Sequence, residues 1–253
     1  MIRMKSIIIA LILCLAFTVQ AQDYIMFSTV TLDPVPSKMK ELRQGLADHK
    51  AKYHEDNTPF QASLFRISSG PNSGKIIWLE GPQKFSDFDD YDGLGQGHGE
   101  HWGTQVEGNC QSMGHTEYWK EWDQYSRNSS KLAPIYVNKY LAVNVKERQG
   151  FRINGLLEKL SAAIKTIEGD FSWSIYSNEF EQGKLGRHFV IVTSFDSWTE
   201  LDKEVNQFGQ RKKIRTAFDK IHGEGSHQRF MDEWRDVFED SYDEVLAVMN
   251  LDE

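Results

Sequence analysis

The order of patterns along the chain is repeated, and this repeat constrains the fold more than any single motif. Residues 24–32 open one copy and residues 135–145 open the other. Each opening stretch is followed by an amphipathic helical pattern, an aromatic strand pattern, a hydrophobic strand pattern and a helical start rich in Phe or Trp and Asp. The copies share this order without obvious sequence identity. The repeat predicts two similar units of roughly 110 residues each.

A short leader precedes the repeat. Basic residues stand before an apolar stretch at residues 7–17, and Val19 and Ala21 are small residues placed as at a cleavage site. The apolar stretch is shorter than the roughly 20 residues that a membrane-spanning helix needs. We expect residues 1–21 to be a secretory signal peptide. The mature protein is then secreted or periplasmic, with no transmembrane span after cleavage.

Charge and cysteine content limit the classes of function. The formal net charge is −8, which argues against nonspecific nucleic-acid binding because that depends on Lys and Arg neutralising phosphates. Only Cys110 remains once the leader is removed, so an intramolecular disulfide cannot form. Cys110 would be a reactive thiol only if a histidine lowered its pKa. Stability must therefore come from hydrophobic cores.

Helical and strand patterns alternate along the first half. Apolar side chains recur at helical spacing from Met39 to Tyr53. Residues 60–67 and 75–80 have the composition of two strands joined by a Gly- and Ser-rich turn, which predicts a hairpin. Another helix is expected at residues 85–91, and a weaker last strand around residues 130–133.

The second half repeats these patterns. A helical stripe runs over residues 153–167, and alternation at residues 171–175 predicts a strand. A returning strand is expected at 188–193, a helix start at 197–201 and a terminal strand at 244–251. Both halves then have the order β-α-β-β-α-β, which is the split βαβ or ferredoxin-like motif.

One such unit has helices on a single face of its sheet, so the other face needs cover. Two copies in one chain can pack sheet against sheet. This arrangement resembles the dimeric α+β barrel superfamily, in particular its tandemly duplicated members. The expected fold class is α+β, with two tandem ferredoxin-like units at residues 22–132 and 133–253 packed as an intramolecular pseudo-dimer.

What this resemblance implies about function is broad, because fold does not choose among activities. The superfamily includes cofactor-free monooxygenases, polyketide cyclases, haem enzymes similar to chlorite dismutase, stress proteins and ligand binders. Its members tend to share a pocket between sheet and helices. Trp78, Trp173 and Tyr140 are candidate ligand-binding aromatics for such a pocket. Ordinary core packing accounts for the aromatic content equally well.

The first predicted helix carries polar groups where its counterpart is apolar. Aligning the leucines of the two helices places His49 opposite Ala163 and Tyr53 opposite Ile167. A histidine that faces a pocket can act as a general base or hydrogen-bond a ligand. His49 and Tyr53 are therefore candidate catalytic residues. The alternative is a histidine at the border of the helix face that bonds a backbone carbonyl.

A Gly- and His-rich stretch at residues 92–116 is the second candidate for chemistry. His98, His101 and His115 lie in it, and histidine binds transition metals. The spacing is not the H-E-x-x-H pattern of zincins. The alternative is that the stretch is a long loop. An HGE triplet recurs at residue 222, but neither His222 nor His227 matches the helix histidine that ligates haem iron in the superfamily.

Two classes of function remain open. One is an exported binding protein that holds a small apolar or aromatic ligand in a barrel-side pocket and needs no cofactor. The alternative is an enzyme with cofactor-free or metal-dependent oxygenase, cyclase or lyase chemistry that uses His49 or the His98/His101 group. A transition metal belongs to this second class. Pairing of the pseudo-dimer into a homo-oligomer also stays open.

Overall fold

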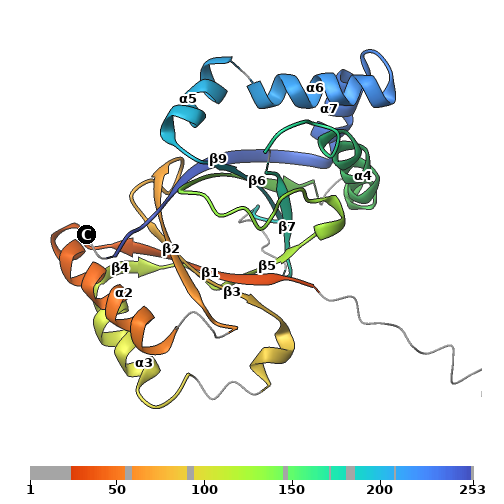
Figure 1. Cartoon of the computed structure of the whole chain (residues 1–253). Helices are drawn as coiled ribbons and strands as arrows, with labels where there is room; N and C mark the ends of the chain where they lie inside the picture. Colours follow the sequence, from red (N-terminus) through yellow and green to blue (C-terminus); the bar gives the residue numbers. More distant parts are fainter. Residues whose placement is uncertain are drawn as a thin grey trace, which may run out of the picture.

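A closed barrel of strands with helices on its outside is the framework of the protein. The computed structural model describes residues 24–54, 59–89, 94–144, 148–170, 172–180, 186–207 and 209–251; the predicted signal peptide lies outside them. The described strands form one antiparallel sheet in the order β3-β2-β9-β6-β8-β7-β5-β1-β4. An additional pairing of β3 with β1 closes eight of these strands into the barrel (Figure 1).

The first half contributes one long helix and five strands. In chain order its main elements are β1 (Met26–Pro34), α2 (Met39–Tyr53), β2 (Ala62–Ser69), β3 (Ile76–Gln83), α3 (His98–His101), β4 (Cys110–Met113) and β5 (Glu117–Glu121). The helix and the hairpin lie where the sequence predicts them. Helix α2 forms because its buried residues, among them Leu42, Leu46 and His49, recur every three or four positions.

Two predictions for the first half are wrong. Its last strand is β5 rather than the segment around residues 130–133. This strand buries Glu117, Trp119 and Glu121 on one face, so carboxylates occupy positions where a hydrophobic pattern expects apolar residues. The described part of the stretch 92–116 is also not a plain loop, because it contains α3, a π-helical segment at Trp102–Val106 and β4.

The helix expected at residues 85–91 is shorter than predicted. The described residues hold one short 3-10 helix at Phe85–Phe88, and Tyr91 lies outside the described residues. Phe88 packs edge-on against Phe60 and Tyr118. The apolar spacing in this segment therefore reflects an aromatic cluster rather than a regular α-helix.

The second half follows the predicted order closely. Its main elements are β6 (Ile135–Val143), α4 (Ile153–Ile164), β7 (Ser174–Asn178), β8 (Phe189–Phe195), α5 (Trp198–Gln207), α6 (Gly209–His222), α7 (Ser226–Val237) and β9 (Phe238–Val248). The predicted helix and returning strand are confirmed. The terminal strand begins earlier than expected, at Phe238, because it continues from the end of α7.

Each half supplies four neighbouring strands of the barrel. These are β5-β1-β3-β2 from the first half and β9-β6-β8-β7 from the second. The halves meet where β2 pairs with β9 and where β5 pairs with β7. Strand β4 pairs with the end of β1, on the edge that β5 also uses.

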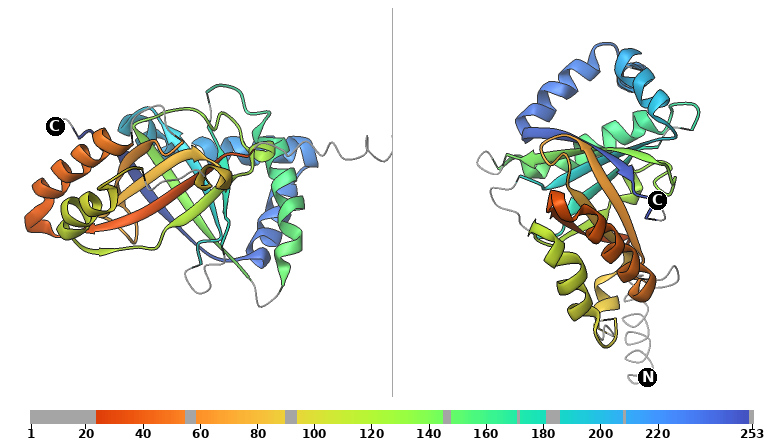
Figure 2. Two further views of the ribbon diagram at one scale, coloured as in Figure 1. Left: turned by 90° about the horizontal axis from the view of Figure 1, so that it is seen from below. Right: turned by 90° about the vertical axis from the view of Figure 1, so that its left-hand side faces the viewer.

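Three hydrophobic layers hold these elements together. Inside the barrel lie the aromatic and aliphatic side chains around Trp119, Tyr140 and Val190. Outside, α2 and α3 cover one side of the barrel, and α4, α6 and α7 cover the opposite side (Figures 1 and 2). The first helix layer is centred on Leu42, Leu46 and Trp78. Within the described residues, no helix has both the length and the apolar character needed to cross a bilayer.

Candidate metal centre

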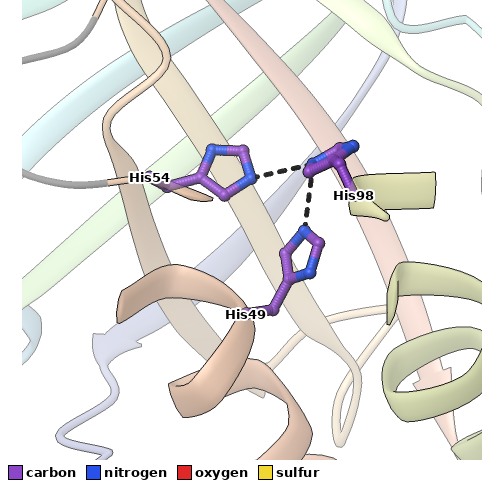
Figure 3. A group of neighbouring side chains, drawn as sticks. All are labelled: His49, His54 and His98. Atoms are coloured by element: carbon purple, nitrogen blue, oxygen red, sulfur yellow. Dashed lines mark hydrogen bonds between the residues drawn. The ribbon is translucent and has the colours of Figure 1, made fainter. Parts of the chain in front are cut away.

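Four histidines gather between α2 and the sheet. His49 lies on α2, His54 is its C-terminal cap, and His98 and His101 belong to α3. The rings of His49, His54 and His98 point toward one another in Figure 3. His49 and His54 are 0% and 1% exposed, whereas His98 and His101 are half-buried. The group is therefore deep on its α2 side and nearer to the surface on its α3 side.

The end of α2 brings His54 back toward His49. On a continuous helix, residues five positions apart point about 140° away from each other. Helix α2 ends at Tyr53, however, and His54 has φ −128° and ψ 50°. The backbone N–H of His54 still bonds the Lys50 carbonyl at 2.9 Å. Its side chain therefore leaves the helical path while the residue stays anchored to the last turn.

Helix α3 and the segment after it are held close to α2. Gly97 begins α3 with a φ of +85°, a conformation that glycine adopts without strain. His98 and His101 are three residues apart and so share one face of α3. In the next segment, the Gln105 carbonyl oxygen lies so near Gly45 that a Cβ on this glycine would be 2.1 Å away. This close approach sets the separation of the two histidine-bearing segments.

The ring nitrogens converge at distances that suit one bound ion. His98 Nε2 lies 3.1 Å from His49 Nε2 and 3.3 Å from His54 Nε2. Two ligand atoms on one tetrahedral ion, each about 2.0–2.1 Å from it, are about 3.3 Å apart. One ring nitrogen from each of the three histidines lies within 4.8 Å of the other two. These three nitrogens can therefore become ligands of one ion after small side-chain movements.

The protons of the rings are arranged as metal ligation requires. His54 Nδ1 donates to the Phe60 carbonyl at 2.7 Å, which leaves its Nε2 as a bare lone pair. His49 Nδ1 lies 3.1 Å from His101 Nδ1, so it can donate there while its own Nε2 is bare. A metal-bound histidine usually donates its other ring N–H to a carbonyl, carboxylate or similar acceptor. Without an ion, the single Nε2 proton of His98 cannot satisfy both neighbouring lone pairs.

The electrostatic environment keeps the rings of His49, His54 and His98 neutral. Burial, followed by the neighbouring His54, His98 and His101, lowers the pKa of His49 to about 3. Burial also lowers the pKa of His54 and of His98. Neutral imidazole is the form that binds a metal ion, so near neutral pH the group offers lone pairs rather than positive charges.

Aromatic residues and one carboxylate surround the group. Trp78 packs edge-on against His54, and Trp102 packs edge-on against His49. The Trp78 indole donates to Glu80 Oε1 at 2.8 Å, and this oxygen is 3.6 Å from His54 Nδ1. Glu80 can thus support the orientation of the His54 ring. Burial raises the pKa of Glu80.

Some of the residues singled out from the sequence come together here and others do not. His49, Tyr53, His98 and His101 form one ring cluster. The hydroxyl of Tyr53 is buried and has no hydrogen-bond partner among the described residues. His115 is not part of this group. It is exposed between β4 and β5 and lines a cavity at one end of the barrel.

The three candidate ligand-binding aromatics lie in three different environments. Trp78 contacts the histidines. Trp173 belongs to the core beneath the second helix layer, and Tyr140 lies inside the barrel with the Arg187 guanidinium 4.1 Å from its ring centre. A single pocket cannot therefore use all three.

His54 is the member of the group that sequence reasoning did not identify. It follows Tyr53 and falls outside the helical periodicity that picks out His49. A usable signal does exist in the sequence: His54 lies just after the helical stripe ends at Tyr53 and a few residues before Pro59, which cannot continue a helix. A polar residue at such a break is free to turn back toward the buried face.

The second helix layer does not fit haem. His222 Nε2 is 3.0 Å from the Lys159 carbonyl and the residue is exposed, whereas His227 packs against Phe218. Buried apolar side chains such as Leu157 and Phe230 fill the space between these helices and the sheet. The described residues of this layer therefore leave no room for a porphyrin.

Cys110 is not poised as a nucleophile. Its Sγ lies 3.4 Å from the Val106 carbonyl, and the residue is half-buried. Burial, with Asp33 and Glu107 nearby, raises its pKa to about 11. The thiol is therefore protonated near neutral pH.

Comparison with known proteins identifies the fold alone. No protein-family profile and no curated protein matches the sequence. A candidate monooxygenase from Lactobacillus acidophilus matches 89% of this chain and 94% of its own, at 8% identity and TM-score 0.52. An anthrone oxidase-like protein matches 91% and 93%, at 13% identity and TM-score 0.52.

A chlorite dismutase from Candidatus Nitrospira defluvii, in complex with imidazole, matches 90% of this chain and 92% of its own. The identity is 9% and the TM-score 0.53. These likenesses extend over nearly the whole of each chain. The chain therefore has an α+β barrel fold similar to theirs, and an α+β barrel is what the sequence predicts.

Proposed function

We propose that this protein is a metal-dependent enzyme that binds one transition-metal ion through His49, His54 and His98. The observation that carries the proposal is the convergence of the three Nε2 atoms. That of His98 lies 3.1 Å from that of His49 and 3.3 Å from that of His54. The hydrogen bond from His54 Nδ1 to Phe60 and the contact of His49 Nδ1 with His101 orient two of these rings. Both are the outer contacts that metal-bound histidines need.

The donor set indicates which ions suit the centre. Three imidazoles without a thiolate suit zinc, copper, iron or nickel better than magnesium or calcium. Three protein ligands leave one position open, as in catalytic rather than structural sites. His98 is less buried than His49 and His54, so the open position is reached most easily from the α3 side. When bound, the ion supplies a Lewis acid or a redox centre.

The reaction that we propose is oxygenase or oxidase chemistry on a small apolar or aromatic substrate. The fold neighbours include a candidate monooxygenase and an anthrone oxidase-like protein, which favours the enzyme interpretation over a plain ligand binder. Trp78 and Trp102 form apolar walls beside the histidines. A binding protein for an apolar ligand has no need of three converging neutral imidazoles, because they would offer such a ligand only unsatisfied polar atoms.

We also propose that Tyr53 acts on the bound substrate. Its ring is 5.0 Å from the His98 ring, nearly perpendicular to it at 88°, and its buried hydroxyl has no partner among the described residues. Under this proposal the hydroxyl donates a hydrogen bond to a ligand in the open position. Glu80 Oε1, 3.6 Å from His54 Nδ1, adds an electrostatic contact to the hydrogen bond that Nδ1 donates to Phe60.

The finer architecture and the location are proposals of the same kind. Two tandem ferredoxin-like units are supported by the repeated element order and by the matching strand order in each half. Export is supported by the composition of residues 1–21. N-terminal sequencing of the protein purified from its own cells tests export, since a chain that starts after Ala21 is expected.

The metal proposal is tested by metal analysis of the protein purified without added chelator, followed by titration of the stripped protein with zinc, copper and cobalt. We expect one ion per chain. The visible spectrum of the cobalt form should report nitrogen ligation in a four-coordinate site. His49→Ala, His54→Ala and His98→Ala should each lose the ion.

His222→Ala is the matched control, since it removes an exposed histidine from the other helix layer and should leave metal binding unchanged. The proposal fails if the stripped protein takes up none of the three ions. It also fails if His54→Ala binds metal as tightly as the parent protein does.

A further inference from the structure

A second candidate site lies at one mouth of the barrel and shares no residue with the four histidines. A cavity of about 210 Å³ opens there between the end of β1, the β2–β3 turn, the β4–β5 connection and Arg187, two residues before β8. Its lining includes four charged side chains and two hydroxyls, from Arg187, Glu117, Lys75 and Asp33 and from Thr31 and Ser112. This volume corresponds to about seven water molecules at about 30 Å³ each, which suits a small ligand.

Arg187 is fixed in place with part of its hydrogen-bonding capacity unused. Its guanidinium lies 4.1 Å from the ring centre of Tyr140 and 5.8 Å from that of Trp119. Its Nη2 is 3.1 Å from Glu117 Oε2. Its Nε is buried and has no hydrogen-bond partner among the described residues. A guanidinium has five N–H donors, and the Nε–H remains for a ligand.

A second buried polar group supports the same wall of the cavity. Glu244 is 1% exposed, and its Oε1 accepts from Asn72 Nδ2 at 2.7 Å. Its Oε2 has no partner among the described residues. Asn72 lines the cavity and its Oδ1 accepts from Lys75 Nζ at 3.2 Å. A purely structural charge network would pair such atoms, so the unpaired Nε of Arg187, a residue that lines the cavity, points to a missing partner.

The charges around the cavity decide what that partner is. Arg187 and Lys75 are cationic, and Glu117 and Asp33 are anionic. Each cation lies beside one carboxylate, with Arg187 Nη2 3.1 Å from Glu117 Oε2 and Lys75 Nζ 3.9 Å from Asp33 Oδ2. A metal ion is disfavoured by the two cations, and a multiply charged anion such as phosphate is disfavoured by the two carboxylates. A ligand that carries one charge of each sign adds no net charge to these two pairs and can contact both members of each. A planar guanidinium is also the group best matched to a carboxylate.

We propose that this cavity binds a small zwitterion of the α-amino-acid type, with its carboxylate on Arg187 and its ammonium group toward Glu117 and Asp33. The hydroxyls of Thr31 and Ser112 would accept or donate the remaining hydrogen bonds. This site does not depend on the metal centre. The two can therefore be tested separately.

Isothermal titration calorimetry of the mature protein, stripped of metal so that chelation plays no part, tests the proposal. The probes are glycine, L-alanine and L-serine, with propionate and ethylamine as ligands that carry one pole only and with inorganic phosphate. We expect an amino acid to bind at least ten times more tightly than either single-pole probe. In nitrogen-15 spectra, the Arg187 Nε–H signal should shift during the titration.

Substitutions at the two poles give opposite signatures. Arg187→Gln should abolish amino-acid binding, whereas Arg229→Gln, at an exposed position on α7, should not change it. Glu117→Gln retains Arg187, which binds the ligand carboxylate, but removes a partner of the ammonium group. The affinities for L-alanine and propionate should therefore become similar. If Arg187→Gln fails to fold, this loss of discrimination still decides the question.

Three results would overturn the proposal. The first is the absence of binding by all three amino acids at millimolar concentration. The second is phosphate binding more tightly than any amino acid. The third is a Glu117→Gln variant that still prefers L-alanine over propionate as strongly as the parent protein.

Discussion

His54 Nδ1 donates a hydrogen bond to the Phe60 carbonyl at 2.7 Å, and this bond determines which nitrogen of the buried ring faces His98. The two residues flank the connection between α2 and β2, so the bond ties the end of the helix to the beginning of the hairpin. His101 stands in a similar relation to His49, through the two Nδ1 atoms at 3.1 Å. Both contacts act on ring orientation rather than on the proposed ion itself.

His101→Ala should therefore weaken metal binding without abolishing it. Loss of such an outer partner typically costs 10–100-fold in metal affinity, and we expect that range here. A competition titration against a chromophoric chelator measures it. His101→Asn, which retains a hydrogen-bonding side chain, should recover part of the loss. Complete loss of the ion in His101→Ala would instead make His101 a direct ligand.

Gly45→Ala should disturb the site without changing any histidine. The new Cβ would lie 2.1 Å from the Gln105 carbonyl oxygen, so α2 must move away from the π-helical segment. His49 then separates from His98 and His101. We expect at least tenfold weaker metal binding and a destabilisation of about 1–3 kcal/mol, typical of overpacking.

Gly155→Ala is the matched control for this variant. Gly155 also lies on a helix, α4, but nothing lies within 4 Å of its added Cβ. The change should leave metal binding intact and stabilise the fold by up to about 1 kcal/mol through helix propensity. Equal metal affinities in the two variants would show that the close approach at Gly45 does not set the geometry of the site.

Much of this arrangement is predictable from sequence, and the exceptions have physical reasons. The buried face of α2 follows from the spacing of Leu42 and Leu46, and His49 lies on that face as predicted. His54 escapes prediction because it lies beyond the end of the helix, where periodicity no longer applies. The partnership of His98 with His49 is also hidden, since it depends on two distant segments meeting at Gly45.

Strand β5 escapes prediction for a different reason. Its buried face carries Glu117 and Glu121, and hydrophobic patterning assigns such residues to the surface. Glu117 is compensated by Arg187, which comes from the other half of the chain. A pairing of this kind can be known only once the barrel is closed.

Glu121→Gln should stabilise the protein at neutral pH. Burial raises the pKa of Glu121, partly offset by hydrogen bonds from Ser129 and Ser126. The folded protein therefore binds the Glu121 carboxyl proton more tightly than the unfolded chain does. The free energy of unfolding falls as the pH rises from the pKa of Glu121 in the unfolded chain to its higher pKa in the folded protein. The amide removes this cost, and we expect a gain on the order of 1 kcal/mol at pH 7.

Denaturant unfolding of parent and variant at pH 7 and at pH 4 measures this effect. The difference should shrink toward zero at the lower pH, where the parent carboxyl is protonated in both states. Glu239→Gln, at an exposed position on β9, is the control and should change little at either pH. A Glu121→Gln gain that is the same at both pH values would rule out the titration as its cause.

Cys110 should react slowly with alkylating reagents. With a pKa of about 11, its thiolate fraction at pH 8 is roughly two orders of magnitude below that of an unperturbed thiol of pKa about 8.5. The rate of iodoacetamide labelling, followed by mass spectrometry in a Cys14→Ser background, measures this. Labelling in denaturant supplies the reference rate. Native and denatured rates that agree at pH 8 would contradict the expected protection.

The way the barrel closes has a consequence for the two halves as separate pieces. Strand β2 is completed by β9, and β5 by β7, so each half covers the open sheet edges of the other. A half expressed alone would present two bare edges, which attract further strands. Two complementary fragments can pair through these edges, and so can the first half of one chain and the second half of another. We therefore expect exchange of halves between molecules to be the main assembly error of this architecture.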